Sequence, residues 1–167
     1  MTKSISSGFT LIELLIVIAV VSILSVILIF TINPQSIITK GQDAKRLTDM
    51  ESIVKAITLA LTSSEVVLAE NDASCATCSS NTGTQSIDGT GYVKFTVPTG
   101  KPGLSGYLPA LPTDPINNGV YIYKFGSTLS NFEVNAVLAH PDNAPKMSTD
   151  GGNDPKVYEI GTSLTIL

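Results

Sequence analysis

The sequence predicts an α+β protein. A long N-terminal helix, transmembrane in its first half and amphipathic in its second half, carries a small antiparallel β-sheet head packed on it. Three observations lead to this class. No charged residue occurs at positions 14–39. Apolar side chains then recur at spacings of three and four residues through positions 43–62, as they do on one face of a helix. Short β-prone runs, separated by turn-forming residues, follow after residue 91.

The composition excludes several classes of protein. The chain has 167 residues, 43% of them hydrophobic, and a net charge of −4. We therefore expect neither a disordered polar chain nor a protein that binds nucleic acid through a basic surface. One His and two Cys are too few for a zinc site built from several such ligands or for a disulfide-dense scaffold. No nucleophile-elbow, Walker or dinucleotide-binding motif occurs, so we do not expect an enzyme.

The apolar segment at positions 9–32 is long enough to cross a membrane. A helix of that length would measure about 36 Å, and the hydrocarbon core of a bilayer is about 30 Å thick. A buried core helix would normally show a polar face, and a signal peptide has a shorter apolar run followed by a small-residue cleavage site. Glu13 is the exception inside this segment, since a carboxylate in lipid costs about 3 kcal/mol. Either it lies at the interface or is protonated, or it meets a cation within the membrane.

A second helical segment is predicted over positions 33–63. Pro34 lacks the N–H of a helix interior but suits the first position of a helix, so Asn33-Pro34 predicts a kink or a restart within one long helix over positions 9–62. The apolar stripe beyond it predicts the face on which the sheet packs. Its members are Leu47, Met50, Ile53, Val54, Ile57, Ala60 and Leu61.

The remaining residues, 64–167, are predicted to form the β-rich head. Positions 64–91 lack a regular pattern, and strand-like runs occur at positions 92–97, 120–125, 132–139 and 157–160. Apolar and polar residues alternate over positions 132–136, which predicts a half-buried strand.

The residues from Gly8 to Leu14 resemble the processing site of type IV pilins and type II secretion pseudopilins. The pattern combines a Gly–Phe junction, a Glu four residues after the Phe, and a long aliphatic helix. The resemblance implies that a prepilin peptidase removes residues 1–8 by cleavage between Gly8 and Phe9, and that the new N-terminus at Phe9 is methylated. It also implies a role for Glu13, which would neutralise the Phe9 ammonium of a neighbouring subunit.

The resemblance further implies the function and the location of the protein. It is expected to be a structural subunit of a type IV pilus-like filament that polymerises through its N-terminal helix. Its partners would be copies of itself, the prepilin peptidase and an inner-membrane assembly platform. The chain would be a single-pass membrane protein with its head outside the cytoplasm, and then part of a cell-surface or periplasm-spanning filament.

Two alternatives to the pilus subunit stay open at this point. The Pro-x-Asp-Pro stretch at positions 112–115 resembles pseudopilin heads and favours a major pseudopilin of a type II secretion system. A protein of a different class, an uncleaved membrane-anchored extracytoplasmic binding module, would need neither Glu13 nor the Gly8–Phe9 junction.

Two further groups of residues are candidates for sites in the head. Cys75 and Cys78 form a C-x-x-C pair in a Ser/Thr-rich stretch, which predicts a small structural disulfide, with free thiols or a redox site as alternatives. The loop at positions 140–155 is rich in oxygen ligands, and related pseudopilins hold Ca²⁺ in a loop of this region. The resemblance thus implies Ca²⁺ as a candidate cofactor, and solvated turns are the alternative. The candidate ligands are Asp142, Asp150, Asn153 and Asp154.

Overall fold

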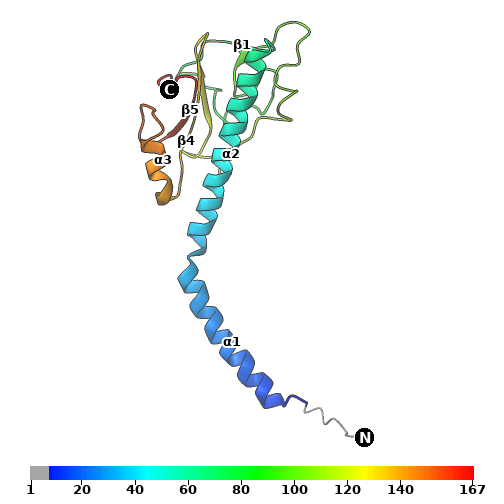
Figure 1. The fold of residues 1–167 in the computed structure, drawn as a ribbon, viewed down its shortest axis with the longest axis vertical. Coiled ribbons are helices and arrows are strands. Elements are labelled where there is room, and N and C mark those ends of the chain that lie inside the picture. The colour runs from blue at the N-terminus through cyan, green and yellow to red at the C-terminus, as the bar shows by residue number, and fades with distance from the viewer. Residues whose placement is uncertain (1–7) are drawn as a thin grey trace. The chain divides into compact units, whose positions relative to one another are not determined.

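The computed structural model describes residues 8–167, without the side chains of residues 27–32. The predicted leader therefore lies outside the described residues, except for Gly8. The chain divides into two compact units, Met1–Ile38 and Thr39–Leu167. The α+β class is confirmed, with long N-terminal helices followed by small antiparallel sheets (Figure 1).

The first unit contains helix α1 (Leu11–Ile32) and the start of helix α2 (Pro34–Thr62). Asn33 separates the two helices in the left-handed conformation, with φ of 43°. The predicted restart at Pro34 is confirmed, and it divides the helical segment expected over positions 9–62 into two helices, of which the first begins at Leu11. The reason is local, since proline removes a helix donor and disfavours helical backbone at the residue before it, and Asn tolerates the left-handed region.

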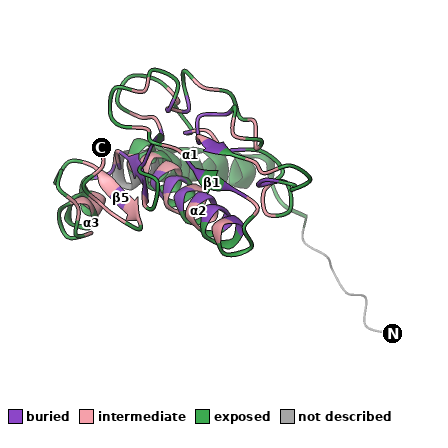
Figure 2. Ribbon diagram, turned by 90° about the horizontal axis from the view of Figure 1, so that it is seen from above, coloured by how far each residue is buried: buried purple, intermediate pink, exposed green. Residues whose placement is uncertain are grey.

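In the second unit, one face of α2 supplies a wall of the hydrophobic core (Figure 2). Met50, Ile53, Ile57 and Ala60 are buried, as their spacing predicts. They belong to one cluster with aromatic and aliphatic residues of the head, which include Tyr92, Leu111, Tyr123, Phe125, Phe132 and Val134.

The described residues of the head form two antiparallel sheets instead of the one that was predicted. Strands β3 (Lys124–Ser127), β4 (Phe132–Ala136) and β5 (Tyr158–Gly161) pair in the order β3-β4-β5. Strand β1 (Val67–Leu68), in a segment predicted to lack pattern, pairs with β2 (Phe95–Thr96). A strand of only two residues is too short to show an alternating pattern. Its partner β2 also lies far away in the sequence, so neighbouring residues do not indicate the pairing. Two short helices, η1 (Pro141–Asn143) and α3 (Ala144–Ser148), follow β4.

Strand β4 is buried on both of its faces, so the prediction of a half-buried strand is wrong. Phe132 and Val134 face the hydrophobic core, and Glu133 and Asn135 alternate with them but are also buried. The C-terminal residues account for part of this cover. The backbone N–H groups of Ile166 and Leu167 donate to Glu133 Oε2, at 2.6 and 3.2 Å.

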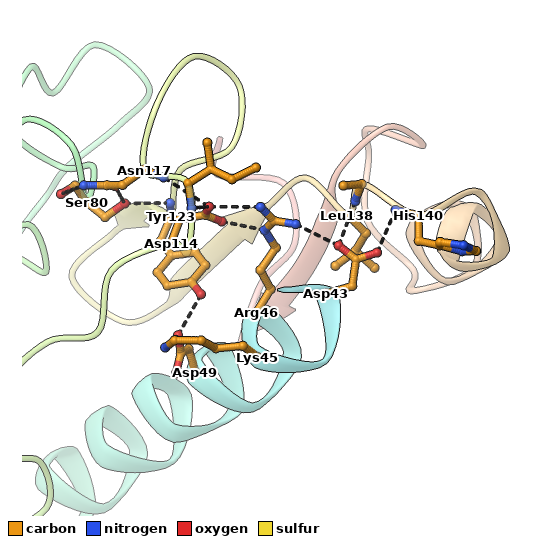
Figure 3. A network of polar contacts seen from close by, with 12 residues as sticks. Asp43, Lys45, Arg46, Asp49, Ser80, Asp114, Asn117, Tyr123, Leu138 and His140 are labelled. Atoms are coloured by element: carbon orange, nitrogen blue, oxygen red, sulfur yellow. Dashed lines mark hydrogen bonds and ion pairs between the residues drawn. The ribbon is translucent and has the colours of Figure 1, made fainter. Parts of the chain in front are cut away.

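A buried arginine connects α2 to the loop before β3. The Arg46 side chain is 0% exposed. Its Nε and Nη2 donate to the two carboxylate oxygens of Asp114 at 2.6 and 3.0 Å, and its Nη1 donates to Asp43 Oδ1 at 2.8 Å (Figure 3). The Arg46–Asp114 pair is bidentate, which is the strong geometry for a guanidinium and a carboxylate.

The two aspartates also bind backbone donors from distant segments. Asp43 accepts the N–H groups of Ala139 and His140, both at 2.8 Å, and Asp114 accepts the N–H of Ile116 at 2.8 Å. Burial alone would raise the pKa values of both carboxyls, but these hydrogen bonds and those from Arg46 outweigh it and lower both pKa values. The aspartates therefore stay ionised, and α2 holds two loops through one charged cluster.

We expect Asp114→Ala to destabilise the head strongly, because it leaves the buried Arg46 guanidinium with half of its partners. Removing one member of a buried ion pair costs about 3–5 kcal/mol. The control is Lys45→Ala, which breaks the partly exposed pair between Lys45 and Asp49 and should cost less than about 1 kcal/mol. Urea unfolding of the full chain in detergent micelles, followed by tyrosine fluorescence, measures both values. Equal losses would contradict the role given to Arg46.

Candidate functional site

Glu13 is held in a capping box at the start of α1. Thr10 is the N-cap of α1, and its Oγ1 accepts the N–H of Glu13 at 3.3 Å. In return, the Thr10 backbone N–H and hydroxyl donate to Glu13 Oε2 at 2.9 and 2.8 Å. This reciprocal pattern stabilises the first turn. A carboxylate accepts several hydrogen bonds at once, so Glu13 remains able to take a further donor.

Gly8 and Phe9 lie before this helix and are exposed. No described atom lies within 4 Å of the position that a Cβ on Gly8 would occupy, so the fold of the described chain does not require glycine there. Phe9 is 81% exposed. Both residues of the predicted cleavage junction are therefore accessible in the monomer.

Apart from Glu13 and two serines, the described surface of α1 is apolar on all sides. Its large side chains from Leu11 to Val26 are between 49% and 78% exposed. The two hydroxyls on this surface bond within the helix, Ser22 Oγ to the Ile18 carbonyl at 2.7 Å and Ser25 Oγ to the Val21 carbonyl at 2.8 Å. The helix thus offers an apolar surface whose polar side chains do not need water.

Over the residues that the structure describes, none of the helices combines the length and the apolar character that a membrane span requires.

Cys75 and Cys78 are joined by a disulfide in the loop between β1 and β2. The Cα atoms are 5.4 Å apart, and the Cys78 N–H donates to the Cys75 carbonyl at 3.4 Å. The bridge therefore closes a single turn. It lies in irregular chain, without the helix N-terminus that would stabilise a catalytic thiolate.

Each of the four predicted Ca²⁺ ligands has a hydrogen-bond or ion-pair partner within the described chain. Asp142 pairs with Lys40 at 2.7 Å, and Asp154 accepts the N–H of Lys156 at 2.9 Å. Asp150 accepts the N–H groups of Gly152 and Glu159, and the side-chain amide of Asn153 donates to the Leu167 carbonyl. Among the described residues, no group of three or more His, Cys, Asp or Glu side chains is placed to hold a metal ion.

The charged cluster of Asp43, Arg46 and Asp114 is not among the sites predicted from the sequence. A signal for the first two was present, because positions 43 and 46 continue the spacing of the buried positions 50, 53, 57 and 60. A charged pair in the register of an apolar stripe predicts burial with partners. No comparable local signal identifies Asp114 as the third member.

Comparison with known proteins identifies the N-terminal segment. Residues 3–29 match the family model described as the prokaryotic N-terminal methylation motif. This match is consistent with a prepilin-type motif of type IV pilin-like and pseudopilin proteins. Neither the search of curated proteins nor that of solved structures gives a match.

We expect reduction of the Cys75–Cys78 bridge to cost little stability. In the chain-entropy description a loop this short contributes about 2 kcal/mol or less. Intact mass should rise by two hydrogens on reduction, and urea unfolding with and without reductant measures the cost. A double Cys75→Ser, Cys78→Ser variant should not respond to reductant. Rapid alkylation of both thiols in the native, unreduced protein would contradict the bridge.

Proposed function

We propose that this chain is a structural subunit of a type IV pilus-like filament that polymerises through α1 after its leader is removed. One observation carries the proposal: beyond Glu13, the described surface of α1 is apolar and exposed on every side, in the segment that matches the methylation motif. So large an apolar surface requires cover. Lipid covers it before assembly, and the same helices of neighbouring subunits cover it afterwards.

The membrane is the proposed location of the unassembled subunit. The charge-free run at positions 14–39 supports this, as do the internally bonded hydroxyls of Ser22 and Ser25. The proposed division is a leader at positions 1–8, an anchor at 9–32, an amphipathic helix at 33–63 and a head at 64–167. The head lies outside the cytoplasm, where the Cys75–Cys78 disulfide persists.

Glu13 is the proposed assembly residue. Cleavage between Gly8 and Phe9 by a prepilin peptidase creates an ammonium at Phe9, which is then methylated. In a bundle of apolar helices that cation needs a partner, and pairing two buried charges costs far less than burying either alone. The capping box holds the Glu13 carboxylate at the first turn of α1, next to where Phe9 of a neighbouring subunit would arrive. A single polar pair of this kind also specifies axial register.

The major pseudopilin of a type II secretion system is the second candidate. It is favoured by the Pro-x-Asp-Pro stretch, whose Asp114 binds Arg46 of α2 in the buried cluster. Both candidates use the same processing and the same helix, and the inner-membrane assembly platform is a proposed partner of both. Deletion of the gene distinguishes the two candidates. If the deletion abolishes protein export but leaves surface fibres intact, the chain is the pseudopilin.

The first prediction of this proposal concerns processing. Intact mass of the native protein should show the loss of residues 1–8 and the gain of one methyl group at Phe9. Gly8→Leu should retain the leader, although nothing in the fold opposes a side chain at that position, because the peptidase needs access to the scissile bond. An unprocessed N-terminus in cells that contain the peptidase would favour the uncleaved binding module.

The second prediction concerns Glu13→Ala. The variant leaves the Phe9 ammonium unpaired in the filament, at a cost of about 3–5 kcal/mol per subunit contact. In the membrane it removes a costly charge, so insertion should be undiminished. The variant should accumulate in the membrane, be cleaved after Gly8, and fail to form filaments in electron micrographs.

Glu70→Ala is the matched control, since it removes an exposed carboxylate from the head and should assemble normally. Glu13→Ala filaments at wild-type levels would show that the proposed charge pair does not drive assembly.

A further inference from the structure

One row of side chains crosses the three-stranded sheet, from Lys124 through Asn135 to Glu159. Lys124 of β3 lies directly opposite Asn135 of β4, and Asn135 lies directly opposite Glu159 of β5. Residues that are opposite each other in an antiparallel pair project from the same face of the sheet. This face points away from the hydrophobic core, because Val134 and Ala136 on either side of Asn135 belong to that core. An amine, a carboxamide and a carboxyl group are thus placed in adjacent positions.

Asn135 and Glu159 form the kind of cross-strand pair in which side chains approach most closely. The backbone N–H of Glu159 turns away from β4 and donates to Asp150 Oδ2 at 2.8 Å, so the pair is one of those that exchange no backbone hydrogen bonds. The side chains are buried, with 6% of Asn135 and 2% of Glu159 exposed. Asn135 Oδ1 and Glu159 Oε1 have no hydrogen-bond partner within the described chain. Since buried polar atoms are almost always satisfied, these two oxygens need an explanation.

Glu159 is suited to hold a proton at neutral pH. Burial first, and then the charges of Glu133 and Asp150, raise its pKa to about 7, although the N–H of Asp154 opposes this shift. A protonated carboxyl group has an O–H donor that an amide oxygen can accept. A carboxyl group with a pKa close to the ambient pH also accepts and donates protons readily, as general acid–base catalysis requires.

Lys124 supplies an amine on the other side of Asn135. It forms no ion pair in the part of the chain that the structure describes. The Cβ atoms of opposite residues lie about 5 Å apart, a distance that the flexible stem of a lysine covers. Lys124 and Asn135 also line the same cavity, of about 590 Å³. An amine that enters a cavity loses water, which favours its neutral and nucleophilic form.

We propose that Lys124 and Asn135 become joined by an intramolecular isopeptide bond, with Glu159 as the group that transfers the proton. The neutral amine of Lys124 attacks Cγ of Asn135, and the new N–C bond forms. The Cγ–Nδ2 bond then breaks, and ammonia leaves. Glu159 accepts the proton that the attacking nitrogen loses and donates one to the departing nitrogen, so its own protonation is the same before and after the reaction. The reaction consumes no oxidant, reductant or further reactant.

Such a bond would tie the central strand β4 to β3. Residues 124–135 would form a closed ring that contains the turn between the two strands. A covalent ring of this kind stabilises a fold mainly by reducing the conformational freedom of the unfolded chain. The alternative is a row of polar side chains that do not react, in which Glu133 and Glu159 share one proton. The proposal does not depend on filament assembly.

The test is the mass of the full chain purified in detergent, followed by proteolysis and sequencing of linked peptides. We expect the main species to be lighter by one ammonia molecule than its sequence requires, after any processing of the N-terminus is taken into account. We also expect a linked peptide that joins Lys124 to Asn135. Lys124→Arg should fold, because the side chain is exposed, but should retain the ammonia and yield no linked peptide. Its Tm should be lower on the order of 10 °C.

Two further variants separate the role of Glu159 from a general effect on the cavity. Glu159→Gln keeps both reacting groups and removes a buried charge, so it should fold. It should lower the rate of bond formation by about a hundredfold or more, because it lacks the group that transfers the proton. Lys156→Arg changes another lysine of the same cavity and should form the bond as the wild type does.

A wild-type chain that retains its full mass would refute the bond and support the row of unreacted side chains. Ammonia is also lost when an asparagine cyclises, and Asn118 before Gly119 is a candidate for that reaction. In that case the mass loss would persist in Lys124→Arg without a linked peptide, and the proposal would be wrong. Bond formation at the wild-type rate in Glu159→Gln would exclude the role given to Glu159.

Discussion

The head depends on the two ion pairs of the buried Arg46 guanidinium. It binds Asp43 three residues earlier on α2 and Asp114 in a distant loop, and Asp43 in turn binds the backbone of Ala139 and His140. Apolar burial is not directional, whereas a bidentate ion pair without solvent fixes both distance and direction. The cluster therefore specifies where two irregular segments cross α2, which the neighbouring Met50 and Ile53 alone would not do.

The apolar side chains of the long helices are buried in the second unit of the chain and exposed in the described part of the first. In the second unit, the apolar stripe of α2 is covered by aromatic and aliphatic residues of the head. In the first unit, the described apolar side chains of α1 are exposed, and the capping box and the two serines satisfy polar groups within the helix itself. A segment that satisfies its own polar groups and leaves its apolar surface uncovered is suited to lipid and then to identical helices, which is the basis of the proposed filament.

Strand β4 shows how one alternating pattern supports two environments. Phe132 and Val134 complete the hydrophobic core, while on the opposite face Glu133 binds the C-terminal residues and Asn135 is also buried. The cover removes water from carboxylates that remain close to one another. Because burial and the neighbouring carboxylates raise the pKa of Glu159 to about 7, the stability of the sheet depends on pH.

The sequence by itself determined the features that depend on near neighbours. These include the apolar helix, its restart at Pro34, the buried positions Met50, Ile53 and Ile57, and the Gly8–Phe9 junction with Glu13, since each is a matter of spacing within a few residues. Only the tertiary structure decided the partner of Arg46, which is 68 positions away, the pairing of β1 with β2, and the burial of Glu133 and Glu159. The physical reason is that the paths of the irregular loops decide which polar residues come into contact and which are shielded from water. The spacing of residues along the chain does not predict those paths.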